Sequence, residues 1–409
     1  MLSVNEIIRN AEASAKELFK LIDEDISVYN QKKVLDAFRE CKVSYHHFNP
    51  TTGYAYDDAG REKLAEVFAK VFGAEKAIVS PNIVSGTHAL TVALFGLLKA
   101  GDTLVGATGA PYDTLQEVIG GENNGSLRDY GINYKEFALK NDKIDIESVS
   151  EYLREHKPAV VMITRSRGYS WRDALSVEEI GEAVKAFRKA YAGVTVLVDN
   201  CYGEFVGKTE PTEVGADVIA GSLIKNPGGG LAPTGGYIAG KEAAVTRIGY
   251  RLTAPSIGTE VGSYYQSYMP FFEGLFFAPS VVANALKGAI LAANALGLLG
   301  YEVKPATGEM PRDIICSVKF NAREPMISFI QGIQYASPVE SYATPEPWAM
   351  PGYDDEVIMA AGTFVQGASI ELSSDAPVRE PYIAYLQGGL TYQHCKIALA
   401  ECLKRILKG

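Results

Sequence analysis

Short apolar segments that alternate with helical stretches between about residues 77 and 240 constrain the fold of this chain most strongly. Several of these segments are apolar throughout, which is typical of strands buried on both faces of a parallel or mixed sheet covered by helices. The predicted strands are 77–80, 103–105, 160–164, 195–199, 218–220 and 236–239, and the helices between them include 86–98, 145–156 and 177–191. The sequence therefore predicts an α/β domain with a doubly wound, mostly parallel sheet.

The length of the chain, 409 residues, calls for a second unit, because one hydrophobic core rarely grows past roughly 250–300 residues. Residues 1–47 carry apolar side chains at helical spacing and are predicted to form an N-terminal helical segment. Residues 48–270 are assigned to the large α/β domain, and residues 271–409 to a smaller α+β C-terminal domain. The C-terminal elements are predicted as a helix at 281–299, strands at 314–320 and 368–372, and a last helix at 393–407.

Composition and charge limit the class of protein and the kinds of binding partner that this chain can have. Hydrophobic residues make up 47% of the chain, which excludes a disordered protein, and the formal charge of -10 argues against a nucleic-acid partner. Five scattered cysteines without a Cys-x-x-Cys pair indicate a reducing compartment, and the five histidines show no metal-ligand spacing. No unbroken apolar run of about 18 residues and no signal peptide are visible, so we expect a cytoplasmic protein that does not bind a membrane.

A small, glycine-containing turn leads from the strand at 77–80 into the helix at 86–98. Such a turn exposes free backbone N–H groups at the positive end of a helix dipole, which suits an anion such as phosphate. Gly86 lets the backbone approach an anion closely, and Ser85 and Thr87 add hydroxyl groups. Taken alone, the same pattern also fits an ordinary capped helix start.

Two ionisable side chains follow neighbouring strands of the predicted sheet. Asp199 ends the strand at 195–199, where a carboxylate can pair with a cationic ring nitrogen, ligate magnesium or cap a turn. Lys225 follows the next strand and precedes three glycines. Partial burial there is predicted to lower its pKa and make it a nucleophilic amine, although an isolated loop lysine is usually a solvated one.

The order of these features, an anion turn, then a strand-end acid, then a strand-end lysine, fits one cofactor. Pyridoxal 5'-phosphate carries a phosphate, a ring nitrogen that must stay protonated, and an aldehyde that forms a Schiff base with a lysine. Ser222, three positions before Lys225, would add a hydroxyl to the phosphate cup. Tyr112 begins the next strand-to-helix connection and either stacks on the ring or is a surface turn residue.

Beyond these features, the sequence resembles the fold-type-I pyridoxal-phosphate enzymes of cysteine and methionine metabolism. It is most similar to the methionine gamma-lyase-like family, whose members are also described as cystathionine beta-lyase-like proteins associated with aluminium resistance. The stretches that carry the resemblance cover nearly the whole chain in order, at 54–61, 84–89, 165–172, 199–205, 225–230 and 386–391.

The resemblance implies a role for each motif residue. Lys225 would be the catalytic Schiff-base lysine and Asp199 the partner of the ring nitrogen, while Tyr112 would stack on the ring. The cofactor phosphate would be held by the turn residues Ser85, Gly86 and Thr87 together with Ser222. The family also implies a homotetramer built from dimers, in which a loop carrying a catalytic Tyr56 reaches into the neighbouring site.

Two departures from the related lyases concern their arginines. Those enzymes carry Tyr-x-Arg in the aromatic loop, where the arginine grips the neighbour's phosphate, but here Asp58 stands two positions after Tyr56. They also bind the substrate carboxylate with the arginine of an Arg-Leu-Ser-x-Gly stretch, which here reads Tyr-Leu-Gln-Gly-Gly from residue 385. We expect Arg379 to take the carboxylate role, with Arg165 and Arg167 as rivals.

The function predicted from this resemblance is that of a pyridoxal-phosphate-dependent carbon–sulfur lyase, of cystathionine beta-lyase or methionine gamma-lyase type. Two alternatives stay open. One is another reaction of the same cofactor, such as γ-replacement, transamination or racemisation, because the cofactor site alone does not decide the outcome. The other is a non-catalytic regulatory protein that binds the cofactor.

Overall fold

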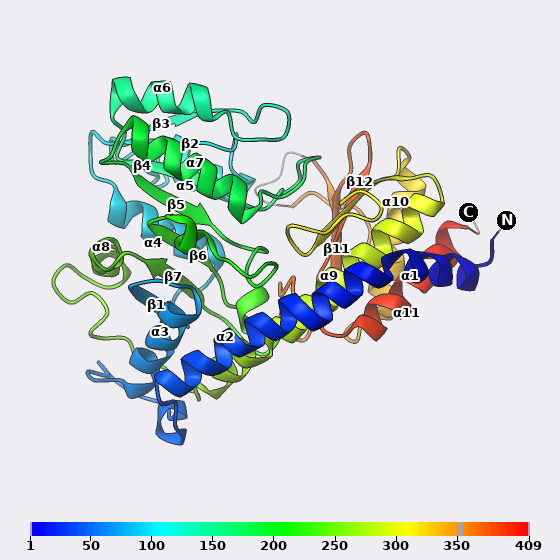
Figure 1. Ribbon diagram of the computed structural model, residues 1–409, viewed down its shortest axis with the longest axis horizontal. Coiled ribbons are helices and arrows are strands. Elements are labelled where there is room, and N and C mark those ends of the chain that lie inside the picture. The colour runs from blue at the N-terminus through cyan, green and yellow to red at the C-terminus, as the bar shows by residue number, and fades with distance from the viewer. Residues whose placement is uncertain (1, 351–354, 408–409) are drawn as a thin grey trace.

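The computed structural model describes residues 2–350 and 355–407, which form two lobes, each built around one β-sheet (Figure 1). The larger lobe contains a seven-stranded sheet of order β1-β7-β6-β5-β4-β2-β3. Only β7 runs against its neighbours, and the other paired strands are parallel. Its strands are β1 (Lys76–Ser80), β2 (Thr103–Gly106), β3 (Asn133–Glu136), β4 (Val160–Thr164), β5 (Thr195–Asp199), β6 (Val218–Ser222) and β7 (Gly236–Gly240).

Helices cover both faces of this sheet, because successive residues of its central strands are apolar and point to opposite sides. In β4, Val161 and Ile163 belong to one core cluster, and Val160 and Met162 belong to another. The helices on the first side are α3 (Ala59–Val71), α6 (Ile146–His156) and α7 (Val177–Ala190). Those on the second side are α4 (Gly86–Leu97), α5 (Asp113–Gly120) and α8 (Glu242–Leu252). The predicted doubly wound α/β sheet is confirmed.

The N-terminal segment is helical, as predicted. Helix α1 (Val4–Leu21) begins at Ser3, whose hydroxyl and the Glu6 carboxylate form a capping box, and it continues through a π-helical turn into α2 (Ser27–Glu40). Both helices pack along α9 (Met269–Leu298), so they cross the whole molecule on one side (Figure 1).

Helix α9 is long and apolar, and it enters both hydrophobic cores. Phe271 and Leu275 near its start lie in the core of the large sheet, and Leu291 and Leu296 near its end lie in the core of the smaller sheet. By length and composition it could cross a membrane, yet 72% of its most apolar window is buried inside the protein. That burial is typical of a core helix.

The smaller lobe contains an antiparallel five-stranded sheet of order β10-β11-β12-β9-β8. Its strands are β8 (Glu302–Lys304), β9 (Ile315–Lys319), β10 (Val357–Ala360), β11 (Ser373–Pro377) and β12 (Ile383–Gln387). Helices α10 (Arg323–Ala336) and α11 (Tyr392–Ile406) pack against each other beside it.

The predicted strand at 368–372 is wrong, because these residues form turns and the strand begins at Ser373. The alternation of Ile370 and Leu372 with polar residues resembles a strand. However, the carboxylate of Glu371 accepts hydrogen bonds from the N–H groups of Phe364 and Val365, at 2.9 Å each, and this holds the chain in a turn.

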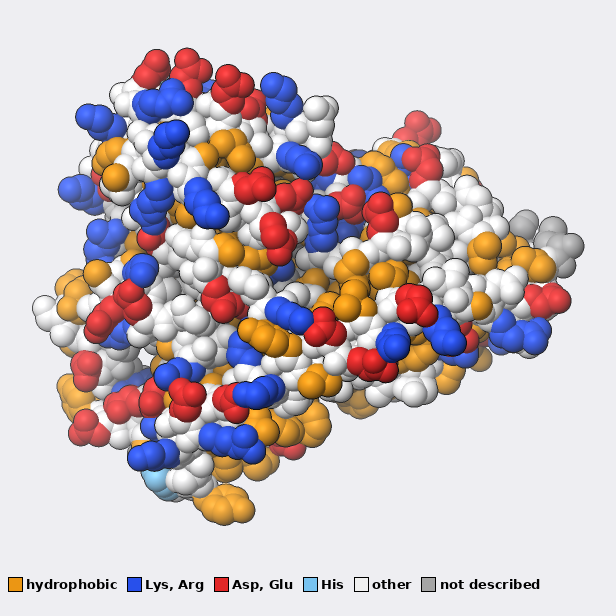
Figure 2. All heavy atoms as spheres, viewed as in Figure 1, with side chains coloured by type: hydrophobic (Ala, Val, Ile, Leu, Met, Phe, Trp, Pro, Cys, Tyr) orange, Lys and Arg blue, Asp and Glu red, His pale blue; other side chains and the backbone are white. Residues whose placement is uncertain are grey.

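Charged side chains of both signs are interspersed on the face seen in Figure 2, with apolar side chains between them. No single acidic patch gathers on this face.

Candidate active site

The carboxyl ends of β5 and β6 bring together the two ionisable residues that the sequence predicted. Asp199 is the last residue of β5 and pairs in register with Ala220 of β6, and Lys225 follows β6 by three positions. Asp199 is only 3% exposed, and it lies close enough to Lys225 for each to change the pKa of the other. The predicted juxtaposition of acid and amine is present in the folded chain.

The predicted lowering of the Lys225 pKa is wrong for the chain by itself. Burial alone lowers the pKa of this amine, but the acidic groups of Cys201, Tyr202 and Asp199 outweigh burial and hold the pKa well above its usual value. Burial raises the pKa of Asp199, against the effect of Lys225 and of the Cys201 N–H, which donates to Asp199 Oδ1 at 3.2 Å. Lys225 is therefore an ammonium group at neutral pH.

Tyr202 lies against Lys225, and the sequence did not single it out. The Lys225 Nζ lies 4.2 Å from the centroid of the Tyr202 ring, a cation–π contact. Tyr202 adopts a left-handed backbone with φ of 69°, which is uncommon for a residue with a large side chain. A sequence pattern does not reveal such a conformation.

The predicted anion turn lies beside the same strand ends. Gly86 is the first residue of α4, and a Cβ added there would lie 3.4 Å from Cys201 Sγ and 3.4 Å from Ser222 Cβ. The start of α4 therefore packs directly against the strand ends that carry Asp199 and Lys225. Gly86 has no side chain to block this close approach, and with the N–H groups of the first helical turn it forms the Gly86 cradle, a candidate anion site.

The hydroxyl groups around this cradle have separate partners. Ser85 Oγ caps α4 by accepting the N–H of His88 at 3.0 Å, and Ser222 Oγ accepts the N–H of Ile224 at 3.3 Å. Thr87 Oγ1 and the Tyr112 hydroxyl share a hydrogen bond of 3.1 Å. Burial raises the pKa of Tyr112, with Asp199 contributing to the rise, so Tyr112 also belongs to this group.

The aromatic loop before α3 presents two exposed tyrosine rings. The rings of Tyr54 and Tyr56 are 74% and 63% exposed, and their centroids lie 5.8 Å apart. Within one chain the Tyr56 ring therefore lies beside the Tyr54 ring. The resemblance places the catalytic role of Tyr56 in the site of a neighbouring subunit, and that role stays a prediction.

Asp58 and Arg61, at the departure from the Tyr-x-Arg pattern, stabilise the path of this loop. Asp58 caps α3 and accepts hydrogen bonds from the hydroxyls of Thr51, at 2.6 Å, and Tyr268, at 2.8 Å. Arg61 is buried and donates to the backbone carbonyls of Ala55, Glu260 and Gly262. Its guanidinium therefore binds the loop of its own chain.

The three arginines considered for the substrate carboxylate lie in different settings. Arg379 is exposed in the connection between β11 and β12, and its Nη1 lies 2.8 Å from Asp355 Oδ2. Arg165 and Arg167 are buried, and each binds the side chain of another buried residue. The assignment of Arg379 stays a prediction.

One acidic residue beside the site was missed by the sequence interpretation. Asp375 of β11 accepts hydrogen bonds from the Tyr169 hydroxyl at 2.7 Å and from Gln387 Nε2 at 2.9 Å. Burial raises its pKa to about 6, and Lys225 opposes this rise, so the smaller lobe contributes an acid to the surroundings of Lys225. A single acid in the Ser-Ser-Asp-Ala-Pro stretch was the signal available in the sequence.

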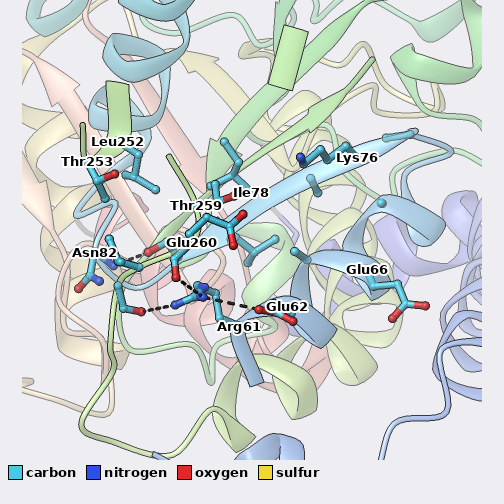
Figure 3. Close-up of a pocket in the computed structure, with 18 of the residues that line it drawn as sticks. Arg61, Glu62, Glu66, Lys76, Ile78, Asn82, Leu252, Thr253, Thr259 and Glu260 are labelled. Carbon is cyan, nitrogen blue, oxygen red and sulfur yellow. Dashed lines mark hydrogen bonds and ion pairs between the residues drawn. The ribbon is translucent and has the colours of Figure 1, made fainter. Parts of the chain in front are cut away.

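A separate hollow of about 620 Å³ lies along β1, between α3 and the segment 252–262 (Figure 3). Arg61, Glu62 and Glu260 are among its lining residues, and the lining includes neither Lys225 nor Asp199. It is therefore distinct from the site at the strand ends.

The fold and the strand-end site together define a class. The pyridoxal-5'-phosphate dependent protein YhfS from Escherichia coli superimposes with a TM-score of 0.61, covers 98% of this chain and 97% of its own, and is 16% identical. At that identity the likeness concerns the fold alone. The chain has the fold-type-I architecture of pyridoxal-phosphate enzymes.

Closer comparisons give the family. The model of the Methionine gamma-lyase family matches residues 4–407, and the chain belongs to this family. The uncharacterized protein YnbB of Bacillus subtilis (strain 168) is 49% identical over 401 residues, 97% of this chain and 95% of YnbB. A carbon-sulfur lyase involved in aluminum resistance from Clostridium novyi NT is 49% identical, with a TM-score of 0.95 over 98% of this chain and 96% of its own.

Proposed function

We propose that this protein is a pyridoxal-phosphate-dependent carbon–sulfur lyase that acts on a sulfur amino acid, of cystathionine beta-lyase or methionine gamma-lyase type. The observation that carries the proposal is the meeting of Lys225, Asp199 and the Gly86 cradle at neighbouring strand ends. Membership of the Methionine gamma-lyase family and the likeness to the Clostridium novyi lyase support the type of reaction.

The residues present fit the cofactor. The N–H groups at the start of α4 and the lack of a side chain at Gly86 suit a phosphate, with Thr87 and Ser222 beside them. The buried carboxyl of Asp199 suits a protonated ring nitrogen. Tyr112 shares a hydrogen bond with Thr87 and lies within electrostatic range of Asp199, so its ring is near the proposed cofactor site. When bound, pyridoxal phosphate supplies an aldehyde that condenses with amino groups and a ring that accepts the electrons of a substrate carbanion.

Lys225 is the proposed general base at the α-carbon of the substrate, and it must be neutral to accept that proton. In the chain by itself, Asp199 is one of the groups that keep Lys225 protonated. A cationic ring nitrogen held by Asp199 would compensate its negative charge and lower the pKa of Lys225, so that more of the amine would be neutral and able to accept a proton. Asp199 thus controls the proton on the ring nitrogen and the basicity of Lys225 together.

The test of this proposal is the visible absorption of the purified protein, followed by keto-acid release from L-cystathionine and L-methionine. We expect an absorption band that is lost in Lys225→Ala and kept in Lys241→Ala, which changes an exposed lysine paired with Glu75. We expect the wild-type protein and Lys241→Ala to release a keto acid and a thiol. A colourless wild-type protein, or a coloured one that releases neither product, would contradict the proposal.

Assembly into a homotetramer belongs to the same proposal. The exposed rings of Tyr54 and Tyr56 support it, because neighbouring apolar rings that protrude from a loop are typical of a protein interface. Light scattering coupled to size-exclusion chromatography should give the mass of four chains, and Tyr54→Ser combined with Tyr56→Ser should lower it. A monomeric wild-type protein would overturn the assembly.

A further inference from the structure

The ammonium group of Lys225 contacts an aromatic ring. Its Nζ lies 4.2 Å from the centroid of the Tyr202 ring, within the range of a cation–π contact. Within residues 2–350 and 355–407, this Nζ takes part in no hydrogen bond and no ion pair. The ring is therefore the group of the described chain that contacts this charge directly.

Acidic groups also face Lys225, and they come from several elements. They are Asp199 at the end of β5, Cys201 and Glu204 in the turn that follows, Tyr112 before α5 and Asp375 on β11. These groups influence the proton on Nζ by their charge. A neutral aromatic ring favours an ammonium over an amine through its quadrupole and needs no charge of its own. Burial raises the pKa of the Tyr202 hydroxyl, which keeps this ring neutral.

Tyr202 reaches this position through an unfavourable backbone conformation. Its φ of 69° lies in the left-handed region that residues with large side chains rarely adopt. Phe205 in the same turn is also left-handed, with φ of 63°, but its ring is buried in the hydrophobic core. Burial compensates the strain at Phe205, whereas Tyr202 keeps partial exposure and contacts an ammonium. Strained backbone that persists in this way is typical of functional sites.

A buried polar cluster fixes the turn on both sides of Tyr202. Arg165 Nη1 donates to Asn200 Oδ1 at 2.8 Å, and Asn200 Nδ2 donates to Glu210 Oε2 at 3.1 Å. The other carboxylate oxygen of Glu210 accepts the N–H of Phe205 at 3.0 Å. Asn200 and Phe205 are therefore held by the same acid, and the segment between them keeps the Tyr202 ring against the amine.

We infer that Tyr202 is a positioning residue for Lys225, whose ring holds Nζ at the site and stabilises it while it carries a proton. For its use in the reaction, this inference rests on the proposed function. When the amine takes the α-proton of the substrate, the Cα–H bond breaks, an N–H bond forms at Nζ, and the electron pair stays with the substrate. The charge that then arises on Nζ is the charge that the ring contacts.

The test measures how readily Nζ of Lys225 loses its proton in the full chain, after bound cofactor has been removed with hydroxylamine. Formaldehyde with cyanoborohydride methylates neutral amines, so the methylation rate at pH 9, followed by peptide mass spectrometry, reports the neutral fraction of Lys225. The variants are Tyr202→Phe and the same substitution with one, two or three fluorines on the ring, which weaken the quadrupole and hardly change the shape. We expect the rate at Lys225 to rise with each fluorine, by about 2- to 30-fold over the series.

Two controls accompany this series. Lys241, an exposed lysine paired with Glu75, should be methylated at the same rate in every sample. The same fluorinated rings placed at Phe187, a buried core residue, should leave the rate at Lys225 unchanged. A constant rate at Lys225 across the series at Tyr202 would overturn the inference, and so would an equal rise in the series at Phe187.

Keto-acid release by the cofactor-loaded wild-type protein separates this inference from the proposed function. A graded rise at Lys225, in a protein that releases no keto acid, would contradict the lyase and leave the role of Tyr202 supported. A constant rate at Lys225, in a protein that releases keto acid, would overturn the role of Tyr202 and leave the lyase supported.

Discussion

At the scale of single residues, the proposed site rests on a buried layer of polar side chains. Glu204 lies fully buried below the strand ends, and the Tyr237 hydroxyl donates to its Oε1 at 2.7 Å. Its Oε2 has no hydrogen-bond partner within the part of the chain that the structure describes. Burial raises the pKa of Glu204 to about 8, so this side chain is a neutral acid at neutral pH.

Glu204 should make stability depend on pH. Its pKa is about 8 when folded and about 4.5 when unfolded, so between these values the folded state binds the extra proton. The free energy of unfolding should therefore fall as pH rises from 5 to 8, by at most about 1.4 kcal/mol per pH unit. Glu204→Gln, which mimics the neutral acid, should flatten this dependence. Urea unfolding at pH 5.5 and pH 8 would show it, and an equal slope for both proteins would contradict it.

The sequence identified the residues that follow strands directly and missed those that reach the site across the fold. Asp199, Ser222 and Lys225 were predictable because the carboxyl ends of neighbouring parallel strands meet at one edge. Asp375 and its partner Tyr169 are 206 positions apart, so no local pattern connects them. The pKa of Lys225 also depends on groups that folding brings together, and for that reason its predicted direction was wrong.

At the scale of elements, the start of α3 combines a helix cap with tertiary contacts. Asp58 accepts the N–H groups of Gly60 and Arg61 and the hydroxyls of Thr51 and Tyr268. We expect Asp58→Ala to lower the free energy of unfolding by about 2–4 kcal/mol, because the cap, one buried and one partly buried hydroxyl bond are lost together. Thr51→Val, which removes one of these bonds, should cost about 1 kcal/mol. Urea titration measures both, and equal costs would contradict this account of α3.

In the large sheet, strands with continuous apolar sequences were predicted closely, whereas the polar edge strand β3 was not; the apolar strands β10 and β12 of the smaller sheet were missed. The predicted 160–164 and 195–199 coincide with β4 and β5, because burial on both faces demands apolar residues throughout. Edge strand β3 reads Asn-Tyr-Lys-Glu and is mostly exposed, so its sequence carries no such demand. The helix predicted at 281–299 was found to begin earlier, at Met269.

At the scale of the whole molecule, one buried ion pair joins the two lobes. Arg167 follows β4 of the large sheet, and its guanidinium binds both carboxylate oxygens of Asp313, which precedes β9 of the smaller sheet. Arg167 Nη1 also donates to the Lys304 carbonyl at 3.0 Å. This contact positions the loop that carries Tyr169 against the smaller lobe.

Removing one partner of this ion pair should be costly, because the other charge is left buried. We expect Asp313→Ala to lower the free energy of unfolding by about 3–5 kcal/mol. Asp355→Ala, which breaks the exposed pair with Arg379, should change it by less than about 1 kcal/mol. Denaturant titration of the two variants makes the comparison, and similar small effects would contradict the role given to Arg167 and Asp313.

The division of the chain at 47 and 270 stays a prediction, and the structure shows why a sharper boundary could not be predicted. No linker separates the lobes at residue 270, since α9 runs through this position from Met269. Helices α1 and α2 are likewise packed along α9. Periodicity predicts the helices themselves, but it does not say which core each one joins.

Because the two ends of α9 are embedded in different hydrophobic cores, unfolding of either lobe removes packing from a helix that the other lobe also needs. Heating should therefore give a single calorimetric peak for the chain, with no separate step for the smaller lobe. A protease cut in the connection after α9 would leave the downstream fragment without the helix on which its sheet rests. We therefore expect the chain to unfold as one cooperative unit.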